Sequence, residues 1–230
     1  MASLLLLVAF CSSAMANDGT TNLVQNGGFE EADLADTNKP AFWDRLDGLG
    51  VQWVNVPADD GGAGRGKVIR MDTRISEADM VAQWKKVGIT KWDIPKPAKD
   101  PVAATYGLSY YSDSMPVLSG QAYRVSFNFK GAGGAKVWVR GYGKMGPTHR
   151  KRLFEDPLGR RLYETIVNCT LGGKDWTAYS RCFHPTTNTP TVTSMKVMLF
   201  SYWPPGIYWF DDLAITPVSN EVWRADMKEE

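Results

Sequence analysis

Two adjacent carboxylates, Asp211 and Asp212, interrupt the bulky apolar segment 206–215 near the C-terminus. A buried, ionised carboxylate without a partner is costly, so the sequence predicts a cation or a group of backbone donors beside them. A third carboxylate, Glu30, ends the segment 22–30, in which a short apolar strand is expected to run into a Gly-Gly turn. These three acids are the candidates for a charged or metal-binding site.

The segment 136–142 carries a second candidate site. Its two valines lie on one side of the expected strand, and Trp138, Arg140 and Tyr142 lie on the other. Aromatic rings can stack on the C–H faces of sugars, and a guanidinium donates hydrogen bonds to hydroxyl groups, so this face suits a carbohydrate. Further aromatic residues are expected to wall the same cleft: Trp84, Trp92, Tyr202 and Trp203. Alternatively, the face packs beneath an insertion as a second small core.

Enzyme chemistry finds little support in the sequence. A Ser-His-Asp triad needs a positioned histidine, and the chain has only His149 and His184 and no nucleophile elbow. Glycosidases need two carboxylates at a defined separation, and no such pair stands out. For a jelly-roll polysaccharide lyase the candidates are Tyr142, His149 and Arg150, although their spacing does not single them out. We therefore predict a protein without catalytic activity.

Strand patterns dominate the chain that must position these residues. The clearest is 122–130, where apolar and polar residues alternate with a period of two. Short strands separated by Gly- and Pro-rich turns predict an all-β fold, a β-sandwich with a short helical and loop insertion. The other expected strands are 51–56, 67–72, 136–142, 162–168, 177–183 and 193–203.

Two long connections depart from this pattern. In the insertion 74–104, Ser76 is expected to cap a short helix that runs to about Val87, and a loop rich in Pro and Lys follows. The insertion either carries function or covers an open end of the sandwich as a flap. The basic loop 143–161 is either a solvated loop or a contact for an acidic polysaccharide.

The two end segments together resemble carbohydrate-binding modules of families 4 and 9, which are jelly rolls of the galactose-binding-domain type. The resemblance rests on Asn26-Gly27-Gly28-Phe29-Glu30 and on the Asp-Asp strand near the C-terminus, and it covers most of residues 22–215. It implies that the first and last strands pair, and that Glu30, Asp211 and, less directly, Asp212 hold a structural calcium ion. In that case chelation lowers thermal stability. The alternative is that one Asp caps backbone amides or pairs with an arginine.

Composition limits the compartment and the partners. Acidic and basic residues nearly cancel, 25 against 26, which argues against a nucleic-acid binder. Residues 1–16 are typical of a secretory signal peptide, with an apolar run too short to span a membrane. Export would leave Cys169 and Cys182, for which one disulfide is predicted, with two free thiols as the alternative. Residues 221–230 are expected to form a charged, frayed tail.

Together these observations predict a secreted or periplasmic domain over residues 17–220 that binds a polysaccharide or oligosaccharide. It is expected to be monomeric, stabilised by calcium and free of any membrane span. The competing interpretation is an extracellular structural or adhesion domain that uses the same fold to bind a protein, since one fold hosts many functions.

Overall fold

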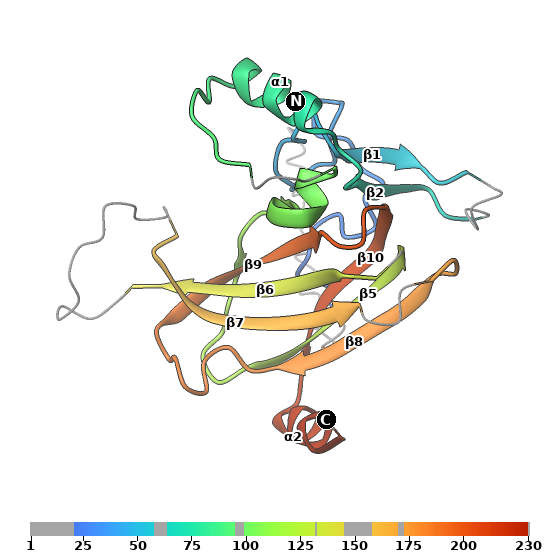
Figure 1. The fold of residues 1–230 in the computed structure, drawn as a ribbon. Coiled ribbons are helices and arrows are strands. Elements are labelled where there is room, and N and C mark those ends of the chain that lie inside the picture. Colours follow the sequence, from blue (N-terminus) through green and yellow to red (C-terminus); the bar gives the residue numbers. More distant parts are fainter. Residues whose placement is uncertain are drawn as a thin grey trace, which may run out of the picture.

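A computed structural model describes residues 21–57, 64–94, 99–131, 133–144, 158–169 and 173–229, with the side chain of the last residue left out. Figure 1 shows two antiparallel β-sheets that face each other, with the helix α1 at one end and the helix α2 at the other. The fold is the predicted all-β jelly-roll sandwich. No helix in the described ranges is long and apolar enough to cross a membrane.

One sheet is built around the long last strand, and we call it the β10 sheet. Its strand order is β1-β2-β10-β5-β8. The strands span Val51–Asn55 (β1), Lys67–Asp72 (β2), Ile207–Val218 (β10), Ala122–Gly131 (β5) and Thr177–Phe183 (β8). The predicted alternation holds on β5, where Phe127 faces inward and stacks on Tyr179 of β8 with ring centroids 5.5 Å apart.

The other sheet, which we call the β6 sheet, has the strand order β3-β9-β6-β7, and the short β4 also pairs with β9. Its strands span Leu108–Tyr111 (β3), Met115–Pro116 (β4), Ala135–Gly143 (β6), Arg160–Cys169 (β7) and Val192–Ser201 (β9). The sequence patterns predicted all of these strands except β3 and β4. The inward faces of both sheets enclose one continuous apolar core, which includes Trp43.

The segment expected to be the first strand, within residues 22–30, is instead a series of turns. It still lies beside the last strand, as the resemblance implied. The backbone N–H of Leu23 donates to the carbonyl of Ile215, and the N–H of Leu213 donates to Gly27. The Asn22 side chain donates to the Leu213 carbonyl and accepts from the Ile215 N–H. Its amide therefore makes the two hydrogen bonds that a neighbouring strand would make with β10.

The insertion contains the predicted helix α1, Glu77–Lys86, whose N-cap Ser76 accepts a hydrogen bond from the backbone of Asp79. It continues into a single π-helical turn, η2, at Val102–Tyr106. The predicted charged tail is wrong, because residues Asn220–Glu229 form the helix α2, which packs along β8. Trp223 of this helix contacts His184, with ring centroids 4.9 Å apart.

The predicted disulfide is also wrong, because Cys169 and Cys182 are both free and buried. Cys169 lies in the core between the sheets. On β8 the inward positions are those of Tyr179 and Phe183, which stack on β5, so Cys182 between them points outward. There its backbone N–H donates to Asp226 of α2. The two sulfur atoms therefore lie on opposite faces of the β10 sheet, which spacing along the chain does not reveal.

This placement predicts the thiol content of the protein. Unfolding in guanidinium without reductant, followed by alkylation, is expected to modify both Cys169 and Cys182, as measured by peptide mass spectrometry. The melting temperature is expected to be the same with and without a reducing agent. Recovery of a disulfide-linked peptide that joins these two residues would contradict the arrangement.

Candidate functional site

The outward face of the β6 sheet carries the predicted aromatic site. On β6, Val137 and Val139 are buried in the core, whereas Lys136, Trp138 and Arg140 point away from it and are half-buried. The Trp138 ring lies between two cations, with the Lys136 ammonium 5.8 Å and the Arg140 guanidinium 5.1 Å from its centroid. Such cation–π contacts position both charges around one flat apolar surface.

Neighbouring strands extend this surface sideways. The register places Trp138 beside Ile166 of β7 and Met198 of β9, and Met198 beside Tyr111 of β3. Met198 faces outward yet is buried, because the larger side chains around it cover it. A row of four apolar side chains therefore crosses the face of the sheet, at the strand separation of about 4.8 Å.

Arg140 is held in place by two partners. Its Nε lies 3.0 Å from Glu164, and one terminal nitrogen donates to the Tyr111 hydroxyl at 3.2 Å. Arg161 contacts the same Glu164 carboxylate at 3.0 Å. Glu164 is thus shared between two arginines, and it positions Arg140 beside the Trp138 ring.

At one end of the face, Tyr202 extends the aromatic surface as predicted. It stacks on Phe200 with ring centroids 5.5 Å apart, and the Lys136 ammonium lies 5.5 Å from its centroid. Trp203 is 54% exposed in the connection between β9 and β10. Lys136 therefore lies between two aromatic rings, those of Trp138 and Tyr202.

The prediction for Tyr142 is wrong, because its side chain is only 7% exposed and offers no free ring face. The strand register shifts between Gly141 and Tyr142 in the pairing with β7, and again at the next residue in the pairing with β9. A bulge adds a residue on one strand, so the simple alternation of faces ends there. His149 and Arg150 lie outside the described residues.

The insertion contributes a second aromatic group. Trp84 contacts both Trp92 and Tyr106, with ring centroids 6.0 Å and 5.6 Å apart. Trp84 packs against the core, whereas Trp92 and Tyr106 are 37% and 42% exposed. Gly107, which follows Tyr106, lies so close to Phe200 that a Cβ atom there would come within 2.5 Å of the ring. The insertion cluster therefore adjoins the Phe200 end of the face.

The acids at the chain ends surround an arginine. Arg65, in the connection before β2, lies 2.6 Å from Asp211 and 3.1 Å from Asp212. Asn128 of β5 donates to Asp212 as well. The Arg65 guanidinium also stacks over the Trp176 ring at 4.1 Å. The cation between the two carboxylates is thus part of the protein.

The third acid, Glu30, accepts hydrogen bonds from the backbone N–H of Lys67 at 3.1 Å and 3.3 Å. Its carboxylate also lies against Gly66, where a Cβ atom would come within 2.1 Å of it. Within the described ranges, no three His, Cys, Asp or Glu side chains are grouped to hold a metal ion. The three predicted calcium ligands therefore contact the segment 65–67, and the calcium site stays a prediction.

Burial raises the pKa of Asp211 to about 6, and the repulsion from Asp212 adds to this, while Arg65 acts in the opposite direction. Since the folded pKa is raised above the ordinary 3.8, ionisation of Asp211 costs stability as the pH rises from about 4 to 6. The ion pair with Arg65 offsets part of that cost. Asp211 is thus a structural carboxylate that depends on its arginine.

Sequence reasoning missed several side chains on this face and in the insertion beside it. Phe200 and Met198 alternate with core residues on β9, so their outward direction was available from the pattern. Tyr111 was missed because β3 is too short to show a period of its own. Tyr106 lies in a π-helical turn, for which the sequence carries no recognised signal.

Comparison with known proteins supports the fold and leaves the ligand open. No protein-family model and no curated protein matches the chain. Among solved structures, TmCBM61 in complex with beta-1,4-galactotriose is 14% identical, with a TM-score of 0.45, and the match covers 85% of this chain and 98% of that chain. A family 16 carbohydrate-binding module is 13% identical, with a TM-score of 0.48 and coverages of 84% and 99%.

Arabinose-bound MgGH51 α-L-arabinofuranosidase is 13% identical with a TM-score of 0.50, and the match covers 89% of this chain but only 28% of that enzyme. Modules of families 4 and 22 match as well. These matches do not favour modules of families 4 and 9 over those of other families. At these identities the likeness concerns the fold alone.

Replacing Arg65 with alanine is expected to lower the free energy of unfolding at pH 7.5 by about 3 kcal/mol, because it leaves Asp211 buried and unpaired. Without Arg65 the pKa of Asp211 lies above its value of about 6 in the unmodified protein, so the loss is expected to shrink as the pH falls towards 6 and the acid of the variant becomes protonated. Denaturant unfolding of both proteins between pH 4 and 8 measures the difference.

Arg45→Ala is the matched control, because it removes an exposed arginine elsewhere, and we expect it to be nearly neutral. EDTA is expected to leave the melting temperature of the unmodified protein unchanged. A clear loss of stability in EDTA that added Ca²⁺ restores would instead support the calcium prediction.

Proposed function

We propose that this protein binds carbohydrate, without catalysis, on the outward face of the β6 sheet. The observation that carries the proposal is the Trp138 ring, held between Lys136 and Arg140 on a face that also presents Tyr111, Phe200 and Tyr202. The aromatic rings of this face offer apolar surface on which a pyranose can stack, and the two cations over the Trp138 ring offer hydrogen-bond donors beside it.

The arrangement is pre-organised, which lowers the cost of binding. Arg140 is fixed by Glu164 and Tyr111, and Trp138 lies beside Met198 of the next strand. Side chains that are already ordered lose little conformational entropy when a ligand arrives. The row across four strands gives an extended platform, which suits several consecutive sugar units better than a single one.

The insertion continues the platform rather than closing it. Trp92 and Tyr106 are exposed at the Phe200 end of the face, where Gly107 brings the two parts into contact. We propose that a polysaccharide or oligosaccharide runs from the Trp138 row towards this cluster. The basic loop 143–161, much of which lies outside the described residues, joins β6 to β7 at the opposite end of the face.

The proposal excludes a catalytic role for the acid on this face, because Glu164 is tied to two arginines. We further propose that the protein is exported, for which the support is the apolar segment at the N-terminus. Retention on no glycan at all, together with capture of one defined protein, would favour the competing adhesion role.

Trp138→Ala is expected to weaken binding to the recognised polysaccharide by at least about tenfold, since anchors of this kind contribute most of the binding energy. Affinity electrophoresis against a panel of soluble plant and bacterial polysaccharides identifies the ligand, and isothermal titration with its oligosaccharides measures the loss. The melting temperature is expected to change little, because Trp138 faces outward.

Trp223→Ala is the matched control, since it removes a tryptophan from α2, which packs along β8 on the other sheet. Normal binding by this control together with lost binding by Trp138→Ala supports the proposed face. Unchanged binding by Trp138→Ala would place the ligand elsewhere on the protein.

A further inference from the structure

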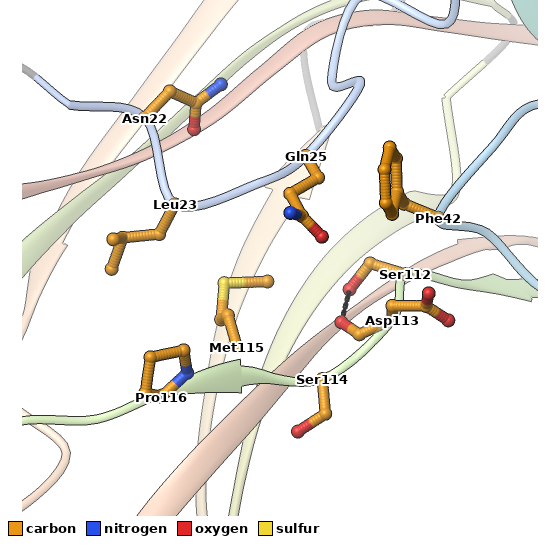
Figure 2. Close-up of a pocket in the computed structure, with 9 residues that line it drawn as sticks. All are labelled: Asn22, Leu23, Gln25, Phe42, Ser112, Asp113, Ser114, Met115 and Pro116. Carbon is orange, nitrogen blue, oxygen red and sulfur yellow. Dashed lines mark hydrogen bonds between the residues drawn. The ribbon is translucent and has the colours of Figure 1, made fainter. Parts of the chain in front are cut away.

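A separate pocket lies at the side of the sandwich, where the N-terminal segment meets the connection between β3 and β4. Its volume is about 360 Å³, at the lower end of the range for small-molecule sites, so it suits a ligand of one ring. Figure 2 shows the Gln25 side chain between the Phe42 ring and Met115, with the segment that carries Asp113 and Ser114 below Gln25 in this view.

Phe42 at the rim has an unusual backbone. Its φ is 65°, in the left-handed region that side chains other than glycine rarely adopt, and its side chain is nevertheless 38% exposed. The surrounding hydrogen bonds impose this conformation, because its carbonyl accepts from Asp113 and the preceding Ala41 is held by Glu31 and Asn26. Phe42 therefore combines a strained backbone with a ring that is exposed to solvent. Strained residues of this kind are found most often at functional sites.

The polar side chains of the pocket divide into two groups. Asn22 and Ser112 are fully used in the fold, since Asn22 binds the backbone of β10 and Ser112 bonds to Asp113 and Val197. In contrast, the side chains of Gln25, Asp113 and Ser114 make no hydrogen bond to any residue that the structure describes. An amide, a carboxylate and a hydroxyl group therefore remain available around one aromatic ring.

We propose that this pocket binds a single uncharged sugar residue, with the Phe42 ring as the stacking surface. Gln25 can donate to and accept from hydroxyl groups, Ser114 can do the same, and Asp113 accepts. Asp113 is the one ionisable side chain among the lining residues, so the local charge is negative and disfavours uronic acids and phosphosugars.

The pocket is distinct from the Trp138 face but adjoins its edge. The residues around Phe42 lie along β3, since Asp44 donates to the Tyr111 carbonyl and a bridge joins Trp43 to Ser112. The Tyr111 side chain ends the row that begins at Ile166 and contains Trp138. The site stands on its own observations and does not require the polysaccharide site to exist.

The test uses methyl glycosides of glucose, galactose, mannose, xylose and arabinose as probes, with the full chain labelled with ¹⁵N. At least one glycoside is expected to shift the side-chain amide signals of Gln25 in a saturable manner and to receive saturation transfer from an aromatic ring. Absence of any saturable shift at Gln25 with all five glycosides up to 50 mM, a concentration on the order of weak millimolar binding, would overturn the proposal.

Phe42→Gly separates a binding role from a structural one. Glycine adopts a positive φ without strain, so this variant is expected to melt at the same temperature or higher while binding weakens at least about tenfold. Asp113→Asn is expected to weaken binding several-fold. Leu34→Ala, which removes a fully exposed apolar side chain elsewhere, is the control and is expected to bind normally.

Trp138→Ala distinguishes this site from the sheet face. It is expected to leave glycoside binding at Gln25 intact, even if it abolishes polysaccharide binding. Loss of glycoside binding in Trp138→Ala, or full binding in Phe42→Gly, would overturn the proposal without affecting the function proposed for the sheet. Loss of polysaccharide binding alone would leave the pocket supported.

Discussion

The buried carboxylate of Asp211 and its guanidinium partner set the geometry on which the fold depends. Arg65 lies two residues before β2 begins, so the pair fixes where β2 meets β10. β2 pairs with β10 only as far as Phe210. Beyond that point the free edge of β10 is covered by the turns at residues 22–27, and Glu30 binds the backbone beside Arg65. Segments distant in sequence thus converge on the ion pair of Arg65 and Asp211. Removal of Arg65 leaves Asp211 buried and unpaired.

The same region shows why the two adjacent carboxylates of Asp211 and Asp212 can lie within an apolar strand. The register of β10 against β5 shifts between Asp211 and Ala214, and Asp212 has a φ of 52°. A bulge at this place turns Asp211 and Asp212 to one arginine, although adjacent strand residues ordinarily point to opposite faces. The Arg65 guanidinium contacts both carboxylates, and the Trp176 ring covers it on one side.

Local patterns predicted most of the fold and part of the site. Alternation over 122–130 and 136–140 identified both the core side and the outward Trp138 and Arg140, because each strand there is regular. The same rule failed at Tyr142, where a bulge follows Gly141. The disulfide was predicted without using alternation, which turns Cys182 away from the core. The helix α2 was missed because its stability comes from packing on β8, which a charged sequence does not reveal.

The outward faces of the two sheets differ in how their polar and aromatic side chains are used. On the β10 sheet the charged side chains are paired with other residues of the protein. Arg65, just before β2, pairs with Asp211, and Arg70 contacts Asp72 and Gln52. The β6 sheet keeps its outward aromatic rings accessible and uses ion pairs only to fix the cations around them. The pocket beside Phe42 lies where the free edge of β10 and the edge of β3 approach each other, so its polar groups belong to neither sheet's hydrogen-bond ladder. Groups left out of both ladders are the ones free to bind a ligand, and on this molecule they lie next to exposed aromatic rings.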